Sequence, residues 1–238
     1  MIRGAHTTLV STREGRRADP ASGYSGRSMR WRGVVLAATA AALLAGCGSS
    51  KAPAPATTTQ PAASALRGLV PEPFPVKPAF TLTDTEGRPY SFTRATKGKL
   101  TYLFFGYTHC PDACPATMSY LKYALSRQPA SIRKQVAVVF VTVDPQRDSR
   151  PVLRRWLDHY DKTFVGLTGS IRQIGDVEHM AGVPTAILRK RKGVASYEVE
   201  HSSVLFVYSP DDRSHVVYAT GFKPQDYAHD LPLLLKFR

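Results

Sequence analysis

The chain has 238 residues, a formal net charge of +14 and three cysteines. By length it has room for one folded domain, and its longest basic run is Arg189–Lys192. A nucleic acid is a poor partner for this charge, because the start of the chain has the pattern of an export signal. We interpret the basic run as a solvated loop, with attraction to anionic lipid headgroups as the alternative.

The first part of the chain, residues 1–46, is predicted to be a leader that export removes. Residues 1–28 are polar and basic without hydrophobic periodicity. Met29 is therefore a candidate for the true first residue of the protein, in which case residues 1–28 would not be translated. A charged segment from Met29 to Arg32 precedes the apolar segment 33–45, which is shorter than the about 20 residues that a membrane span needs. The pattern therefore predicts an export signal rather than a membrane span.

Cys47 directly follows this leader. The sequence Leu44-Ala45-Gly46-Cys47 resembles the bacterial lipobox. The resemblance implies that Cys47 is lipidated and anchors the protein to the cell membrane on its extracytoplasmic side. Each buried CH₂ of an acyl chain contributes about 0.8 kcal/mol, so two or three chains would anchor it stably. In the alternative, the leader is a simple secretory signal and Cys47 has no role. Residues 47–66, rich in Ser, Ala, Pro and Thr, are predicted to be a flexible linker.

Residues 67–238 are predicted to form one α/β domain, with strands read from short apolar runs and helices from a 3.6-residue period. The predicted elements, in chain order, are a hairpin at 80–92, a buried strand at 100–106, a helix at 116–127, a buried strand at 136–143, a helix at 151–160, a short strand at 164–167, a helix at 170–180, a hairpin with strands at 204–208 and 215–219, and a helix at 224–236. This order predicts a sheet with helices on both faces.

Two details of these elements are predicted from single residues. Ser170 is expected to cap the helix that it begins, and Pro232 is expected to kink or interrupt the last helix. Gly182–Thr185 resembles the thioredoxin turn whose proline faces a cysteine pair. The apolar run after it ends at Leu188, however, so we place the next central strand at 204–208 and treat 182–200 as an insertion.

Cys110 and Cys114 follow the first central strand, at a predicted junction between a strand and a helix. There the helix dipole and free N–H groups favour the thiolate, and the arrangement is typical of a thioredoxin-like fold. A structural disulfide closing so short a loop would add little stability. The Cys-x₃-Cys spacing is one residue longer than the redox motif Cys-x-x-Cys, which lets both sulfurs face one metal ion. Two soft thiolates suit Cu(I), and an imidazole ligand suits either oxidation state of copper.

A third ligand is sought among seven histidines, of which His201 has the best predicted position. It opens the strand 204–208, and in a thioredoxin-like sheet the loop entering that strand lies beside the cysteine loop. His109 adjoins Cys110 but is expected to point away from it. The other five are assigned no role, because they lie in the leader, in predicted helices or away from the cysteines: His6, His159, His179, His215 and His229.

Four segments together resemble the Sco/SenC family, in family order across about residues 67–236. They are Gly106–Pro115, Val143–Asp148 with Pro151–Leu153 after it, Gly166–Ser170, and Glu200–Ser203. The resemblance implies a thioredoxin-like fold, here with an N-terminal β-hairpin extension and an inserted β-hairpin or loop region. It also implies copper, as Cu(I) or Cu(II), held by Cys110, Cys114 and His201. Asp144 is either an outer-shell group of this site or a turn-forming residue before Pro145.

The resemblance further implies delivery of copper to a cytochrome c oxidase subunit with copper-binding cysteines. Two classes of function stay open at this point. The first is a membrane-anchored metallochaperone, which needs both cysteines and His201. The second is an enzyme, a thiol-disulfide oxidoreductase acting on exported cysteines, which needs Cys110 and Cys114 but not His201. A peroxidase ranks third, because no polar set for activating peroxide is evident.

Overall fold

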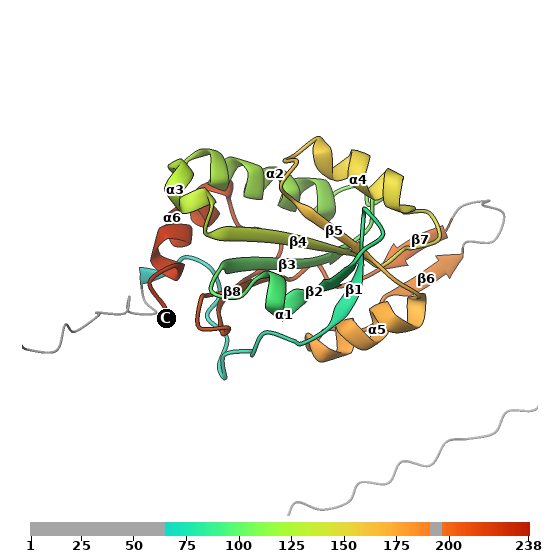
Figure 1. Ribbon diagram of the computed structural model, residues 1–238, viewed down its shortest axis with the longest axis horizontal. Coiled ribbons are helices and arrows are strands. Elements are labelled where there is room, and N and C mark those ends of the chain that lie inside the picture. The colour runs from blue at the N-terminus through green and yellow to red at the C-terminus, as the bar shows by residue number, and fades with distance from the viewer. Residues whose placement is uncertain (1–64, 191–196) are drawn as a thin grey trace, which may run out of the picture. The chain divides into compact units, whose positions relative to one another are not determined.

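A computed structural model describes residues 65–190 and 197–238 (Figure 1). The strands are β1 (Thr81–Asp84), β2 (Pro89–Ser91), β3 (Leu100–Gly106), β4 (Val136–Thr142), β5 (Val165–Thr168), β6 (Ile187–Lys190), β7 (Tyr197–Glu200), β8 (Leu205–Tyr208) and β9 (Ser214–Tyr218). The helices are α1 (Phe92–Ala95), α2 (Ala113–Ser126), α3 (Ala130–Arg133), α4 (Arg150–Asp158), α5 (Ile171–Met180) and α6 (Pro224–Leu234). The predicted leader, Cys47 and nearly all of the predicted linker lie outside the described residues, as do Arg191 and Lys192.

A seven-stranded mixed sheet, in the order β2-β1-β5-β4-β3-β8-β9, forms the centre of the fold. The strands β3, β4 and β5 run parallel, whereas β8 pairs antiparallel with β3. The registers place Gly106 beside Thr142 and Phe104 beside Leu205. The end of β3, the end of β4 and the beginning of β8 therefore meet at one edge of the sheet.

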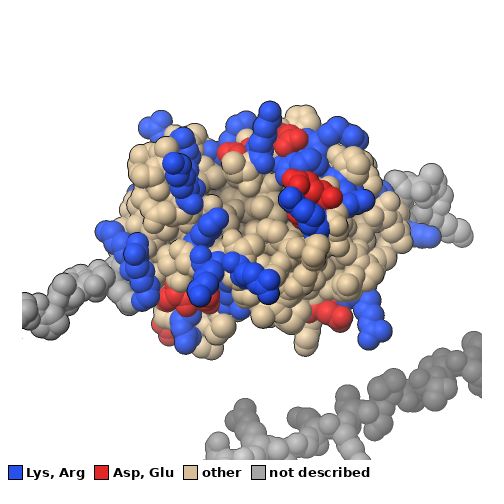
Figure 2. All heavy atoms as spheres, in the orientation of Figure 1, with Lys and Arg blue, Asp and Glu red and all other residues tan. Residues whose placement is uncertain are grey.

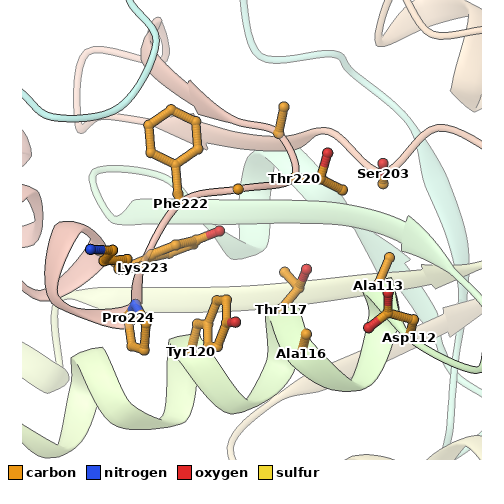
Figure 3. A pocket seen from close by; sticks show the side chains of 13 residues that line it. Asp112, Ala113, Ala116, Thr117, Tyr120, Ser203, Thr220, Phe222, Lys223 and Pro224 are labelled. Carbon is orange, nitrogen blue, oxygen red and sulfur yellow. The ribbon is translucent and has the colours of Figure 1, made fainter.

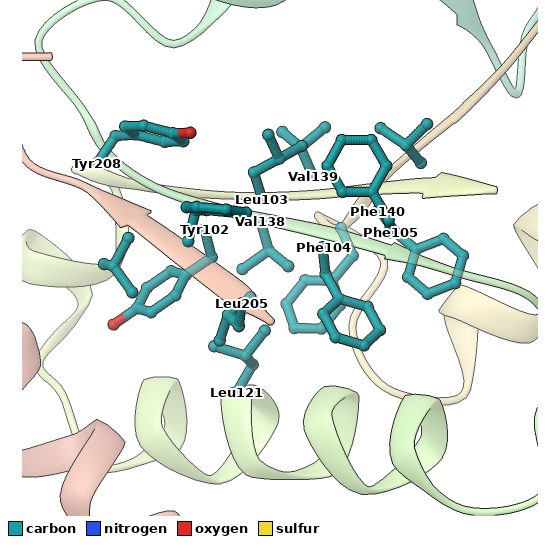
Figure 4. Close-up of a cluster of buried hydrophobic side chains, with 14 of the residues drawn as sticks. Tyr102, Leu103, Phe104, Phe105, Leu121, Val138, Val139, Phe140, Leu205 and Tyr208 are labelled. Atoms are coloured by element: carbon teal, nitrogen blue, oxygen red, sulfur yellow. The ribbon is translucent and has the colours of Figure 1, made fainter. Parts of the chain in front are cut away.

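Helices cover both faces of this sheet, as the sequence predicts: α2, α4 and α6 lie on one side and α1 and α5 on the other (Figure 1). All seven residues of β3 are buried, because the strand is central and covered on both faces. Tyr102 and Phe104 point to the side of Leu121 on α2, and Leu103 points to the opposite side (Figure 4). This alternation gives the sheet two packed layers of side chains.

The predicted elements are largely confirmed, including the N-terminal hairpin extension and the inserted hairpin. The hairpin at 80–92 is present and joins the main sheet through pairing of β1 with β5. Residues within 182–200 form a separate two-stranded sheet of β6 and β7, so the inserted hairpin is also confirmed. Ser170 caps α5 through a reciprocal pair of hydrogen bonds with Gln173. Two four-residue helices, α1 and α3, were not predicted.

Two helices differ from the prediction, one in where it begins and one in that a proline does not interrupt it. The helix α2 begins at Ala113 rather than at residue 116, with Pro115 in its first turn. Proline is tolerated there because the first-turn N–H groups have no partner within the helix. Pro232 does not interrupt α6, which continues to Leu234. It stands in the last turn, where the loss of a single N–H donor affects little of the helix. Among the described helices, none has the length and hydropathy of a membrane span.

Candidate metal centre

The cysteine pair lies where β3 ends and α2 begins. Cys110 is in the connecting loop, and its N–H donates to the carbonyl of Tyr107 at 3.2 Å. Cys114 is the second residue of α2, and its N–H donates to Cys110 Sγ at 3.4 Å. Cys114 is fully buried and Cys110 is half-buried. A Cβ atom at Gly106 would come within 2.7 Å of Cys114 Sγ, so the close approach of this sulfur to β3 requires glycine.

His201 is brought to the cysteines by the antiparallel pairing of β8 with β3. It precedes β8 in the chain, and its Nε2 lies 3.7 Å from Cys114 Sγ. Its Nδ1 is 2.8 Å from the carbonyl oxygen of Ser202. Because a carbonyl can only accept, Nδ1 carries a proton, and Nε2 is the ring nitrogen that can offer a lone pair to a metal ion once it has lost its own proton.

Two aromatic rings fix the plane of the His201 imidazole. The ring of Tyr107 stands edge-on to it with centroids 5.4 Å apart, and that of Phe104 does so at 6.4 Å. One ligand atom from each of Cys110, Cys114 and His201 lies within 4.8 Å of the other two. The structure therefore brings together the three residues that the sequence singled out, one from a loop, one from a helix and one from the entrance to a strand.

The pKa values of the two thiols are shifted in opposite directions. The pKa of Cys110 is well below the ordinary thiol value, chiefly because the Cys114 thiol hydrogen-bonds to it, and His201 adds to this stabilisation of the thiolate. The pKa of Cys114 is raised for the converse reason, and its burial raises it further. At neutral pH the pair is one thiolate and one thiol, so binding a metal ion at both sulfurs releases a proton.

This asymmetry predicts which cysteine an alkylating agent attacks. Because the pKa of Cys110 is low, its thiolate is present on both sides of pH 7, and we expect iodoacetamide to modify it at rates that differ less than about twofold between pH 6 and pH 8. An ordinary thiol would react much faster at the higher pH. Cys114 should stay unmodified in the folded protein, and peptide mass spectrometry can assign the label. A steep rise of the Cys110 rate with pH would contradict the expectation.

Asp148 holds the cysteine loop, a role that the sequence analysis did not assign. Its carboxylate is fully buried and accepts hydrogen bonds from Thr108 N–H at 2.9 Å and Thr108 Oγ1 at 2.6 Å. It also accepts one from Thr142 Oγ1 at 2.6 Å. Since Thr108 is two residues before Cys110 and Thr142 ends β4, Asp148 ties the loop to the neighbouring strand. The sequence signal was its place at the end of Val143–Asp148, one of the segments that carry the family resemblance.

Asp144, the candidate outer-shell residue, is buried but connects to a different partner. It forms an ion pair with Arg147 and accepts a hydrogen bond from the Tyr197 hydroxyl at 2.7 Å. The Arg147 guanidinium lies 3.9 Å from the Tyr197 ring centroid and 5.7 Å from that of Tyr107. Within residues 65–190 and 197–238, no hydrogen bond of Asp144 reaches a cysteine or His201. Asp144 therefore fastens the inserted hairpin near the site.

The remaining histidines of residues 65–190 and 197–238 are not part of the cluster. The His109 side chain is 53% exposed, and its Nδ1 lies 3.7 Å from Asp148. His159 and His179 are exposed on or next to helices, as expected. His215 is paired with Asp211 and His229 with Asp230.

A hollow of about 360 Å³ opens beside the cysteine loop, between α2 and the segment that enters α6 (Figure 3). Its wall includes Asp112 and Ala113, which lie between the two cysteines, and Ser203, two residues after His201. The rings of Tyr120 and Phe222 also line it. The hollow is therefore lined by neighbours in sequence of the three clustered residues, and not by those residues themselves.

Comparison with known proteins identifies the family. The model of the SCO1/SenC family matches residues 70–236, which is most of the chain. The chain belongs to the SCO1/SenC family. Mitochondrial protein SCO2 of Saccharomyces cerevisiae is 33% identical over 60% of this chain. That match covers 46% of the yeast protein, so this chain corresponds to about half of it.

Solved structures of the SCO1/SenC family share the fold. The structure of Bradyrhizobium japonicum ScoI with copper bound is 29% identical, with a TM-score of 0.58, and the match covers 66% of this chain and 98% of ScoI. BsSco, described as a member of the Sco family of cytochrome c oxidase assembly proteins, is 21% identical with a TM-score of 0.55 over 71% of this chain and 99% of BsSco. At that identity BsSco supports the fold alone. The thioredoxin-like fold expected from the sequence is therefore confirmed.

Proposed function

We propose that this SCO1/SenC protein binds one copper ion through Cys110, Cys114 and His201 and delivers it to a partner protein. The observation that carries the proposal is the approach of the three ligand atoms, all within 4.8 Å of one another. The donor set fits copper, because thiolates prefer Cu(I) and imidazole accepts both oxidation states. The copper-bound ScoI structure gives independent support from a relative.

The number and exposure of the ligands suit release of the ion as well as binding. Three protein ligands leave room for a further donor, and Cys110 is only half-buried. Cysteine thiols of a partner could therefore replace the ligands one at a time, beginning at the exposed sulfur. The hollow lined by Asp112, Ala113 and Ser203 would receive the chain that carries those thiols.

The proposed recipient is a cytochrome c oxidase subunit with copper-binding cysteines, and the proposed location is the outer side of the cell membrane. The oxidase is what the resemblance of the four sequence segments to the Sco/SenC family implies. The location is supported by the export signal and by Cys47 in its lipobox-like sequence. A linker of residues 47–66 would keep the domain near membrane partners and raise its effective concentration there.

Copper titration of the protein with His201→Ala tests the ligand assignment. We expect the substitution to weaken copper binding by at least about 100-fold and to change the absorption spectrum, because Nε2 is lost as a ligand. His179→Ala is the matched control, since His179 is exposed on α5 and outside the cluster. Equal affinity and equal spectra in the two variants would show that His201 is not a ligand.

A thiol-disulfide oxidoreductase is the second candidate, favoured by the low pKa of Cys110 beside a protonated Cys114. The Cys110 thiolate would attack a partner's disulfide and release one partner thiolate. Cys114, after losing its proton, would then displace the second, leaving an internal disulfide and a reduced partner that had gained two electrons. Metal-free turnover of a mixed disulfide that persists in the His201→Ala protein would favour this activity over copper delivery.

A further inference from the structure

Lysines are concentrated at the edge of the sheet opposite the metal centre. Lys99 directly precedes β3, Lys134 lies two residues before β4, and Lys162 lies three residues before β5. Because these three strands are parallel, the segments before them meet at one edge. Cys110 follows the other end of β3, whose seven residues at about 3.3 Å each separate the two edges by about 20 Å.

These cations form a basic edge that acidic side chains do not neutralise. Lys97, Lys134 and Lys162 are exposed and Lys99 is half-buried. None of the four forms an ion pair with a carboxylate of residues 65–190 or 197–238. Figure 2 shows Lys and Arg side chains gathered over α1 and α3, which flank this edge.

A hollow of about 420 Å³ lies within the basic edge. Lys99, Arg133 and Lys134 line it together with a single acid, Asp161. The Asp161 carboxylate already accepts hydrogen bonds from Thr163 N–H at 2.8 Å and Thr163 Oγ1 at 2.7 Å. Apolar side chains also line the hollow: Leu125, Val136, Val138 and Val165. It therefore combines positive charge with apolar surface.

We infer that the basic edge, defined by Lys97, Lys99, Arg133, Lys134 and Lys162, lies against an anionic membrane and takes up phospholipid headgroups. Lysine ammonium groups attract anionic headgroups strongly at short range, each contributing about fivefold to membrane affinity. The apolar lining suits the glycerol and upper acyl part of a lipid, which free phosphate lacks. The inference rests on the proposed membrane location but not on copper binding.

The path of the chain agrees with this orientation. In Figure 1 the first described residues (cyan) lie at the same end of the long axis as α3 and the C-terminus. The proposed lipid anchor, Cys47, precedes the first described residue, Ala65, by 18 positions. A domain held from that end with its basic edge on the headgroups would present Cys110, Cys114 and His201 away from the membrane.

Lysine footprinting of the full chain on vesicles tests the inference. The protein is acetylated in the presence of vesicles of phosphatidylcholine alone or with phosphatidylglycerol, and each lysine is quantified by mass spectrometry. We expect Lys97, Lys99, Lys134 and Lys162 to be protected about fivefold by phosphatidylglycerol vesicles and to regain reactivity at high salt. Lys190 and Lys223, which lie on the hairpin and before α6, are internal controls that should not change.

A triple variant separates local contact from overall charge. Lys99→Gln, Lys134→Gln and Lys162→Gln together should remove the protection of Lys97. Arg155→Gln, Arg172→Gln and Lys190→Gln remove the same charge at exposed positions elsewhere and should leave that protection in place. Copper titration of both variants should match that of the unmodified protein, so a failure here is distinguishable from a failure of the copper proposal.

Four results would overturn the inference. The first is equal protection by the two kinds of vesicle, and the second is equal protection of the control lysines. The third is protection by dissolved glycerol phosphate without vesicles, which would assign the hollow to a soluble phosphate ester. The fourth is absence of any protection, which would favour an acidic protein surface as the partner for this edge.

Discussion

Cys114→Ser should reduce copper affinity by more than about 100-fold, the largest effect expected for any single substitution in this protein. A serine hydroxyl stays protonated at neutral pH and is a hard donor, so it replaces the thiolate neither in charge nor in affinity for Cu(I). Cys114 is also the most central ligand, fully buried and within 3.7 Å of His201 Nε2. Competition of the purified protein with a chromophoric copper chelator measures the loss.

The chain supplies a matched control for this experiment. Cys47→Ser makes the same chemical change outside the predicted domain and should leave copper affinity unaltered. Retention of copper by the Cys114→Ser protein, with an affinity within about tenfold of the unmodified protein, would remove Cys114 from the ligand set.

Asp148→Asn is expected to lower the free energy of unfolding by about 2–3 kcal/mol, since it weakens three hydrogen bonds to a buried carboxylate. The amide has one acceptor oxygen instead of two, and its NH₂ group faces the Thr108 or Thr142 donors. The loop that carries Cys110 then loses its connection to the end of β4. We therefore expect copper affinity to fall by about 10–100-fold as well, the usual cost of losing an outer-shell group.

Two measurements separate the effects of Asp148→Asn on stability and on the site. Urea unfolding gives the free energy, and copper titration well below the unfolding midpoint gives the affinity of the folded protein. Asp176→Asn removes an equal charge from an exposed position on α5 and should change neither. Unchanged copper affinity in Asp148→Asn would show that the carboxylate stabilises the fold without positioning the loop.

The sequence was sufficient to predict that the cysteine pair and His201 would meet. Cys110 and Cys114 are close in the chain, and the antiparallel return of the strand 204–208 is the known route by which a thioredoxin-like sheet brings a distant loop to them. The prediction used only which strands neighbour one another, and burial patterns determine that strongly for continuous apolar runs such as 100–106 and 136–143.

Contacts between loops could not be predicted in the same way. Asp148 has its effect through hydroxyl and N–H groups at the ends of two different strands, and no spacing rule relates Thr108 to Thr142. Asp144 was predicted to be either an outer-shell group of the metal centre or a turn-forming residue, but its ion pair with Arg147 and its hydrogen bond from Tyr197 depend on the path of the inserted hairpin. That path follows from packing of the whole domain rather than from local propensity.

The separation of 87 positions between Cys114 and His201 would couple copper binding to folding. An unfolded chain keeps its two sulfurs as neighbours, but the imidazole joins them only after β8 has paired with β3, so the complete site exists in the folded state alone. A ligand that binds only the folded state stabilises it, by about 4.1 kcal/mol at a thousandfold excess over its dissociation constant. Each transfer of the ion to a partner would leave behind a protein that unfolds more easily than the one that arrived.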